Sequence, residues 1–315
     1  MTKKITIRKG QLGLLSRQGD YYQVLEAGEH RLPWFNVPEV LIVNRDGSEV
    51  PEALAEYLRR FQPEWIERYC LAADLTDVEA GALYANGVLQ EILPPSTRRL
   101  YWSAGDEIQL LRIDTRQVAV PADIMNAVLQ PRRHGAVKGR EAILTVSVPA
   151  WHVGVLKIDG ETQALLQPGL SAYWKVNHLV EAEVVDIRLQ VLEVGGQEIL
   201  TKDKVNLRLN LAANWRYSDV LQAFGQLTKP LDHLYRELQF ALREAVGTRT
   251  LDELLEDKKI IDEVVSAQVT ERMAAFGIDV ASLGVKDIVL PGDMKAILSQ
   301  LVEAEKSAQA NVIRR

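Results

Sequence analysis

The chain has 315 residues, of which 47% are hydrophobic and 25% charged, and its formal net charge at pH 7 is -6. This composition is typical of a globular protein, and the negative charge gives no support to a nucleic-acid role. A single cysteine, Cys70, excludes an intrachain disulfide framework, and no apolar run approaches the roughly 18–20 residues of a membrane-spanning helix. We therefore expect a chain that does not span a membrane.

A pattern of glycine and tryptophan recurs three times between residues 13 and 174. In each copy, two glycines stand six positions apart: Gly13 and Gly19, Gly81 and Gly87, Gly154 and Gly160. Each copy then reaches a tryptophan 21, 21 or 20 positions after its first glycine: Trp34, Trp102 and Trp174. A period of about seventy residues predicts tandem modules. The shared position of the tryptophans predicts a core role for all three.

Each copy is expected to contain a β-hairpin. The residue before the second glycine is Gln18, Asn86 or Asp159. Asn-Gly and Asp-Gly favour the type I′ turn, because both central residues of that turn need a positive φ. A lone hairpin is marginally stable in water, so the modules must pack on one another or on further strands.

Two connectors follow the first two copies. Residues 52–69 have apolar side chains at helical spacing, interrupted by Pro63, and residues 121–129 predict a shorter helix. Residues 131–140 are basic and contain glycine and proline, which predicts a linker at a domain boundary.

The C-terminal half changes from the period of a strand to that of a helix. Apolar and polar residues alternate over 185–191 and 207–215, which predicts two half-buried strands. Helical spacing then predicts helices over 231–245 and 261–276, and Thr250 with Glu253 forms a capping box for a short helix between them. A last strand is expected over 278–290, and a helix from 293 to the end of the chain.

The last helix carries an apolar stripe at alternating spacings of three and four residues, the spacing of a coiled coil. The stripe consists of Met294, Ile297, Leu301, Ala304 and Ala308. We predict that it pairs with the same helix of a neighbouring subunit. The alternative is that it packs on its own domain.

Two segments resemble a known family. Residues 186–219 read DIRLQVLEVGGQEILTKDKVNLRLNLAANWRYSD, and residues 247–294 read GTRTLDELLEDKKIIDEVVSAQVTERMAAFGIDVASLGVKDIVLPGDM. Both are similar to the SPFH, or band 7, domain of stomatins, prohibitins and flotillins, and most of all to the slipins. The resemblance spans roughly 146–315 and implies lateral self-association in rings. Slipins usually begin with a hydrophobic membrane hairpin, but this chain has two extra hairpin copies in that place. The order of tandem β-modules, SPFH-like domain and helix is similar to that of major vault proteins, which build closed cages.

The predicted fold class is α+β with a β-rich N-terminal half: tandem antiparallel β-modules, an SPFH (band 7) domain and a C-terminal oligomerising helix. The expected parts are a first β-module at 1–50, a helical connector at 51–72, a second β-module at 73–120, a helix and basic linker at 121–142, the SPFH domain at 143–291 and the C-terminal helix at 292–315.

No catalytic motif is present, and the five histidines are scattered without the spacing of metal ligands. We therefore expect no enzymatic activity, cofactor, metal, small-molecule substrate or nucleic-acid partner. A weaker hypothesis is contact with an anionic membrane surface through four basic residues and a lipidated cysteine: Arg132, Arg133, Lys138, Arg140 and Cys70. A solvated linker and a buried cysteine are the alternative.

The predicted function is a non-enzymatic scaffold in which many copies form a ring or cage that organises or confines other proteins. The expected location is the cytoplasm, peripheral on the inner face of the plasma membrane, and the expected partners are the chain itself and a membrane protein or anionic membrane surface. Three alternatives remain open: an adaptor that regulates a membrane protease or transporter, a vault-like cage without membrane contact, and an enzyme whose site is assembled from dispersed residues.

Overall fold

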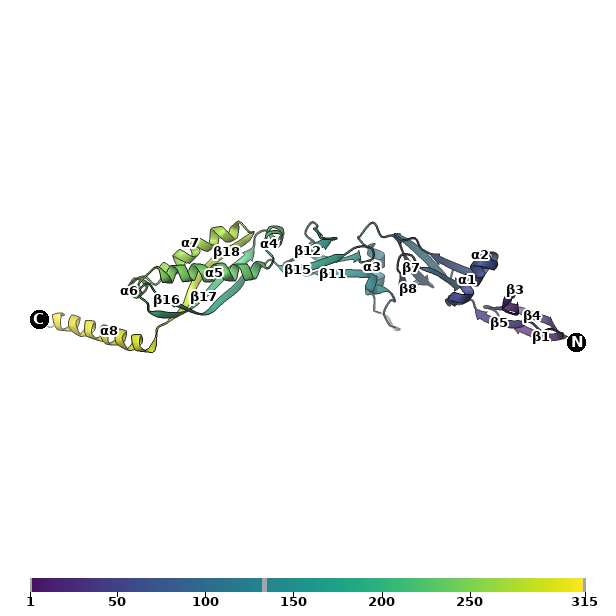
Figure 1. Ribbon diagram of the computed structural model, residues 1–315, viewed down its shortest axis with the longest axis horizontal. Helices are drawn as coiled ribbons and strands as arrows, with labels where there is room; N and C mark the ends of the chain where they lie inside the picture. Colours follow the sequence, from purple (N-terminus) through teal and green to yellow (C-terminus); the bar gives the residue numbers. More distant parts are fainter. Residues whose placement is uncertain (1, 132–134, 314–315) are drawn as a thin grey trace. The chain divides into compact units, whose positions relative to one another are not determined.

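The computed structural model describes residues 2–131 and 135–313. The chain divides into two compact units, drawn with their helices and strands in Figure 1. The first unit contains residues 1–147, 157–162 and 169–182, and the second contains 148–156, 163–168 and 183–315.

The strands from β1 to β15 fall into three successive groups of five. The first group is β1 (Thr2–Ile7), β2 (Gln11–Arg17), β3 (Asp20–Leu25), β4 (Gly28–Pro33) and β5 (Glu39–Asn44). The second is β6 (Cys70–Asp74), β7 (Glu79–Ala85), β8 (Val88–Leu93), β9 (Arg98–Trp102) and β10 (Ile108–Asp114). The third, whose residues are shared between the two units, is β11 (Ile143–Val148), β12 (His152–Ile158), β13 (Glu161–Thr162), β14 (Gly169–Trp174) and β15 (Val180–Asp186).

The same pairing order recurs in every group. The second strand pairs with the third and the fifth, while the first strand pairs with the fourth. The resulting orders are β3-β2-β5 with β1-β4, β8-β7-β10 with β6-β9, and β13-β12-β15 with β11-β14. Even the β-bulge is repeated, between Leu15 and Ser16 in the first group and between Leu83 and Tyr84 in the second.

The first glycine of each copy is explained by close packing. It lies opposite a leucine in every case: Gly13 opposite Leu25, Gly81 opposite Leu93 and Gly154 opposite Leu166. A Cβ atom on any of these glycines would come too close to an apolar side chain near the end of the group's first strand. For the three glycines in order, the distances are 2.8 Å to Ile7, 3.1 Å to Leu75 and 3.2 Å to Val148. Because such distances are shorter than ordinary contacts, only glycine lets this side chain pack directly on the backbone.

The hairpin turns have the backbone that the sequence predicts. Both central residues have a positive φ in all three copies: Gln18 and Gly19, Asn86 and Gly87, Asp159 and Gly160. These dihedrals meet the requirement of a type I′ turn.

The three tryptophans do not share one environment. Trp102 and Trp174 are 3% and 0% exposed, as expected of core residues, but Trp34 is 66% exposed, so the predicted core role is wrong there. The reason is that each buried tryptophan packs on the preceding group. Trp102 lies in one cluster with Leu12 and Leu14 of β2, and Trp174 lies in another with residues of β7 and β8. Trp34 belongs to the first group and would need a surface outside the described residues.

The connectors form the predicted helices. Residues 52–69 make α1 (Glu52–Phe61) and α2 (Pro63–Tyr69), with Pro63 at the start of the second helix, where its missing N–H is tolerated. The shorter helix is α3 (Ala122–Leu129), followed by the 3-10 turn η1 (Arg140–Ala142).

The segment before η1 lies against β8. Val137 is buried, and the amide of Lys138 donates to the carbonyl of Gln90. A Cβ atom on Gly139, which has a φ of +74°, would stand 2.0 Å from the carbonyl oxygen of Ile92. The end of the basic segment is therefore held in place by packing.

The second unit contains a three-stranded antiparallel sheet in the order β16-β17-β18. Its strands are β16 (Gln190–Leu200), β17 (Asn206–Tyr217) and β18 (Ile278–Val289). The predicted alternation along β17 is confirmed, and its buried residues are Leu207, Leu209, Leu211, Ala213 and Trp215. The other predicted strand, 185–191, is interrupted between β15 and β16.

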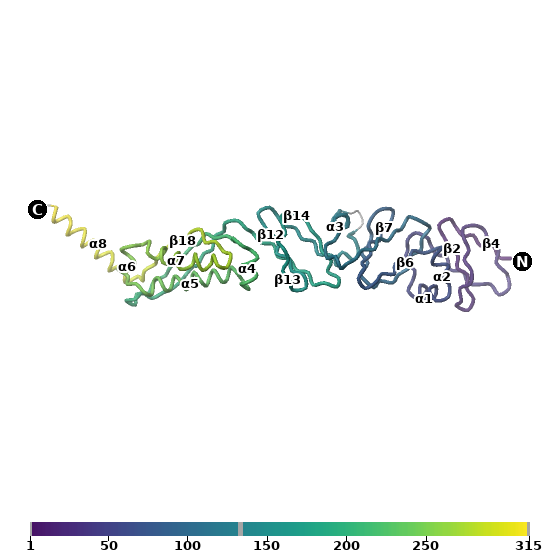
Figure 2. Tube along the Cα trace, turned by 90° about the horizontal axis from the view of Figure 1, so that it is seen from above, coloured from purple at the N-terminus to yellow at the C-terminus, as the bar shows by residue number. Residues whose placement is uncertain are grey.

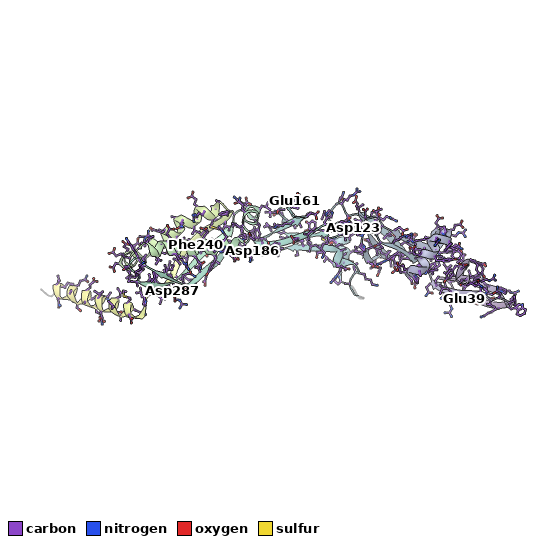
Figure 3. The ribbon with its side chains drawn as sticks, viewed as in Figure 1. Glu39, Asp123, Glu161, Asp186, Phe240 and Asp287 are labelled. Carbon is purple, nitrogen blue, oxygen red and sulfur yellow. The ribbon has the colours of Figure 1, made fainter. Side chains whose placement is uncertain are left out.

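The interruption coincides with a local ion pair. The guanidinium of Arg188 donates to both carboxylate oxygens of Asp186, labelled in Figure 3, at 3.0 Å and 2.6 Å. Arg116 makes the same contact with Asp114 at the end of β10, a recurrence that the sequence analysis missed. In each case the arginine side chain folds back onto the aspartate two residues before it, which is the last residue of its strand. The hydrogen bonds from the arginine lower the pKa of the aspartate.

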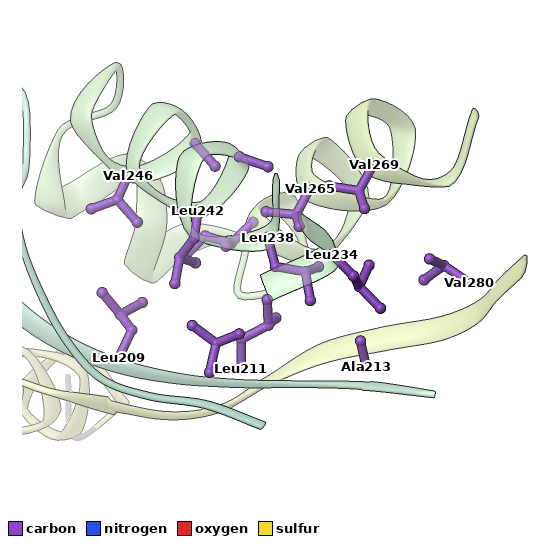
Figure 4. Packing of buried hydrophobic residues seen from close by; sticks show 14 of the residues in the cluster. Leu209, Leu211, Ala213, Leu234, Leu238, Leu242, Val246, Val265, Val269 and Val280 are labelled. Carbon is purple, nitrogen blue, oxygen red and sulfur yellow. The ribbon is translucent and has the colours of Figure 1, made fainter. Parts of the chain in front are cut away.

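Helices cover one face of this sheet. They are α4 (Val220–Gln226), α5 (Pro230–Gly247), α6 (Leu251–Glu256) and α7 (Ile260–Ala274). Figure 4 shows side chains of α5 and α7, such as Leu238 and Val265, packed above Leu211 of β17. The predicted capping box is present: the amide of Glu253 donates to the hydroxyl of Thr250 at 3.3 Å, and the Glu253 carboxylate accepts from the Thr250 amide at 3.0 Å.

The last element is α8 (Gly292–Ile313). Within residues 2–131 and 135–313, no helix combines the length and the apolar character needed to cross a membrane.

Candidate assembly surfaces

Helix α8, seen at the C-terminal end in Figure 2, has no buried residue along its 22 positions. Met294 is partly buried against the core of the second unit, whereas Ile297 and Leu301 are 50% and 55% exposed. Ala304 and Ala308 are also exposed. The structure thus places the five predicted stripe residues on one helix, with four of them facing solvent.

The apolar surface of α8 is wider than the predicted stripe. Val302, Val312 and Ile313 are exposed as well. Large exposed apolar residues on one element usually mark an interaction surface, because water contact with them is unfavourable. The sequence spacing could have included Val312, which follows Ala308 by four positions.

The open face of the β16–β18 sheet carries both charged and apolar side chains. Along β17, Arg208, Asn210 and Arg216 alternate with the buried residues. The guanidinium of Arg216 pairs with Asp279 at 2.9 Å, and Lys286 pairs with Glu193 at 2.6 Å. Cross-strand charges stabilise this face, which also carries the exposed apolar side chains of Val191, Leu200 and Val289.

The residues of the membrane hypothesis are not gathered at one place. Arg132 and Arg133 lie outside the described residues. Lys138 and Arg140 are exposed beside β8, whereas Cys70 lies in β6 opposite Trp102 and packs against a buried cluster. No contact within the described part of the chain joins Cys70 to either basic residue.

Cys70 is also a poor nucleophile. Burial raises the pKa of its thiol to about 12, although the nearby guanidinium groups of Arg45 and Arg59 act in the opposite direction. Because the thiolate is the reactive form, the thiol is inert at neutral pH.

Metal chemistry has no site in the parts that the structure describes. Across residues 2–131 and 135–313, no three histidine, cysteine, aspartate or glutamate side chains come together in the manner of metal ligands.

An exposed apolar patch, which was not predicted from the sequence, lies after β4. The patch consists of Trp34, Phe35 and Val37, which are 66%, 78% and 45% exposed. Trp34 and Phe35 contact each other edge to face, with ring centroids 6.3 Å apart. The exposure of Trp34 could have been predicted from the repeat only if it had been known that each tryptophan packs on the preceding group.

The second unit thus consists of a three-stranded antiparallel sheet covered on one face by helices that include α5 and α7, followed by the exposed helix α8. The chain belongs to the SPFH domain / Band 7 family, whose model matches residues 146–315, just over half of its length.

Several curated proteins are similar to part of the chain. An uncharacterized protein of Archaeoglobus fulgidus is 29% identical over 170 residues, 53% of this chain and 66% of the relative. A stomatin homologue of Pyrococcus horikoshii is 31% identical over 145 residues, 46% of this chain and 54% of the relative. Mechanosensory protein 2 of Caenorhabditis elegans is 30% identical over 129 residues, 41% of this chain and 27% of the relative. The chain thus spans about half to two thirds of the first two relatives.

Proposed function

We propose that this chain is a non-enzymatic subunit of a self-assembling scaffold, a ring or cage that organises or confines other proteins. The observation that carries the proposal is α8, a helix without a buried residue, on which Ile297, Leu301 and Val312 are exposed. Membership of a family with stomatin homologues among its relatives supports a scaffolding or regulatory role. Contact between α8 helices of neighbouring subunits would remove the apolar stripe from water.

The three groups of strands are, in this proposal, tandem copies of one module. Their common pairing order and tightly packed glycine, with a bulge repeated in the first two groups, support this interpretation. Repeated modules that stack on their neighbours form extended surfaces, which suits a subunit that meets further copies side by side. A contact between unlike faces closes into a ring when the rotation between subunits permits.

The location is proposed to be the cytoplasmic face of a membrane, with peripheral attachment. The exposed side chains of Lys138 and Arg140 support attraction to anionic lipid headgroups, each contributing about 1 kcal/mol near such a surface. Co-flotation with anionic vesicles that weakens at high salt would support this attachment, and failure to float at low salt would contradict it.

The assembly is tested by size-exclusion chromatography with light scattering. We expect the full chain to form a particle of many subunits, and a chain lacking residues 292–315 to be much smaller. The double variant Ile297→Asp with Leu301→Asp should also be small, because two carboxylates would be buried in the contact between helices.

A matched control keeps the charge change but moves it to the opposite side of α8. Ser299→Asp with Ala310→Asp should leave the particle size unchanged. A full chain that is monomeric at micromolar concentration, or a stripe variant of unchanged size, would contradict the proposal.

A further inference from the structure

Successive groups of strands are joined in the first unit by one repeated contact. The segment that leaves a group pairs with the edge of the next group's fourth strand. In the first contact, the Val50 amide donates to the Leu100 carbonyl and the Trp102 amide donates to the Ser48 carbonyl, both at 2.8 Å. In the second, Val120 donates to Ala172 and Trp174 donates to Val118, again at 2.8 Å. In both contacts the segment therefore lies beside β9 or β14 as an added strand, in the same register.

The added strand turns into a helix in the same way both times. Pro51 precedes α1 and Pro121 precedes α3, with nearly identical backbone angles. Val50 and Leu54 lie in one buried cluster with Trp102, and Val120 and Ile124 lie in another with Trp174. A Val-Pro segment and its helix thus cover the tryptophan of the group that receives them.

The first group also has a fourth strand that could accept such a segment, but no segment pairs with it among the described residues. Leu32 and Trp34 correspond to Leu100 and Trp102. β4 pairs with β1, and within the described chain no hydrogen bond is made by the Leu32 carbonyl or the Trp34 amide at the other edge. Pro33 does not block this edge, because its own position faces Thr2 of β1. The edge is open and its tryptophan is uncovered.

A charged residue at this edge indicates what the missing segment carries. Arg31 corresponds to Arg99, whose guanidinium lies 3.1 Å from the carboxylate of Glu91 in β8 and 3.5 Å from that of Glu49, the residue before Val50. Arg31 is exposed and has no ion pair among the described residues. A carboxylate placed before Val-Pro would therefore complete the contact as it does between the first two groups.

A second copy of this chain does not supply the segment. The chain has four Val-Pro dipeptides, and the two that continue into helices, at Val50 and Val120, are already hydrogen-bonded within the chain. The surfaces of a second copy on which Trp34 could pack are also covered. In the first and second groups they are covered by Trp102 and Trp174, and at β12 by Val220 of α4.

We propose that the edge of β4 at Leu32 and Trp34, with the exposed side chains of Trp34 and Phe35, is a docking site for a partner polypeptide. The partner supplies an extended acidic-Val-Pro segment that continues into an amphipathic helix. The segment adds a strand to β4, its carboxylate pairs with Arg31, and the helix covers Trp34.

The test uses the full chain and a fluorescein-labelled peptide copied from residues 46–62, which contain the Glu-Val-Pro segment and α1. Fluorescence anisotropy should rise to saturation. Trp34→Ser should weaken binding about tenfold, as expected of a central aromatic contact. Methylating the Val50 nitrogen of the peptide should weaken it similarly, because the donor to the Leu32 carbonyl is lost.

The matched control is Trp151→Ser, which removes a tryptophan that is 68% exposed elsewhere and should leave binding unchanged. Arg31→Gln in the chain and Glu49→Gln in the peptide should each weaken binding. The two changes together should weaken binding no more than either change alone. No saturable binding, or equal binding by the Trp34→Ser chain, would overturn the proposal. Self-association of the chain that depends on Trp34 and excludes the peptide would assign the patch to a second copy instead.

Discussion

At the scale of single residues, glycines with similar backbone angles have different roles. Gly87 and Gly139 have φ values of +75° and +74°. A Cβ atom on Gly87 would meet nothing within 4 Å, whereas one on Gly139 would overlap the Ile92 carbonyl. Gly87 is therefore required by the backbone angle alone, and Gly139 by both the angle and the packing.

Substituting these two glycines separates the two effects. We expect Gly87→Ala to lower the free energy of unfolding by about 1 kcal/mol, the usual cost of a left-handed alanine. Gly139→Ala should cost about 3 kcal/mol, because the segment must also move off β8. Chemical denaturation followed by circular dichroism measures both, and equal losses would show that the contact with Ile92 is absent in solution.

The buried thiol of Cys70 predicts a pH dependence. Its folded pKa of about 12 lies above the ordinary value of 9.0. The folded state therefore holds a proton that the unfolded state loses, so this contribution to stability is intact below pH 9 and decreases as the pH rises toward 12. The melting temperature of the wild type should fall more between about pH 8 and pH 10.5 than that of Cys70→Ala. Parallel curves for the two proteins would show that the thiol is solvated.

At the scale of elements, the repeated contact between groups is carried by one large side chain. Trp102 at the end of β9 and Trp174 at the end of β14 are each buried between the strands of the preceding group and a connector helix. The group, the connector and the tryptophan thus form one packing unit, which explains why the period includes the helices α1 and α3.

Truncating the three tryptophans measures this contact. Trp102→Ala and Trp174→Ala should each lower the free energy of unfolding by about 3–5 kcal/mol, because a large buried side chain is lost. Trp34→Ala should change it by less than about 0.5 kcal/mol, since the side chain is exposed. Thermal unfolding followed by circular dichroism provides the comparison. A large loss for Trp34→Ala would mean that the patch is covered in solution.

At the scale of the whole molecule, the two compact units have separate roles in the proposed assembly. The first unit holds the open edge of β4, and the second holds the family's sheet and α8. Both elements carry exposed apolar side chains, Trp34 and Phe35 beside β4 and Ile297 and Leu301 on α8. A scaffold needs such surfaces, because assembly is driven by apolar area that folding leaves exposed.

Local patterns in the sequence were enough to predict much of this molecule. The alternation along β17, the capping box at Thr250 and the positive φ of the Asn86-Gly87 turn each depend on neighbours in the chain, so the sequence alone determined them. The family resemblance over the C-terminal half was likewise carried by contiguous segments, and the family match confirms it.

Other features were decided by contacts between residues far apart in the chain. Trp34 and Trp102 occupy the same place in the repeat, but within the described residues Trp102 packs on a preceding group and Trp34 does not. Likewise, the strand predicted over 185–191 is interrupted where Arg188 turns back onto Asp186, and Gly139 is fixed by its approach to Ile92. The sequence set the identity and period of these residues, and the tertiary structure decided which of them are covered, because burial depends on what lies opposite each side chain.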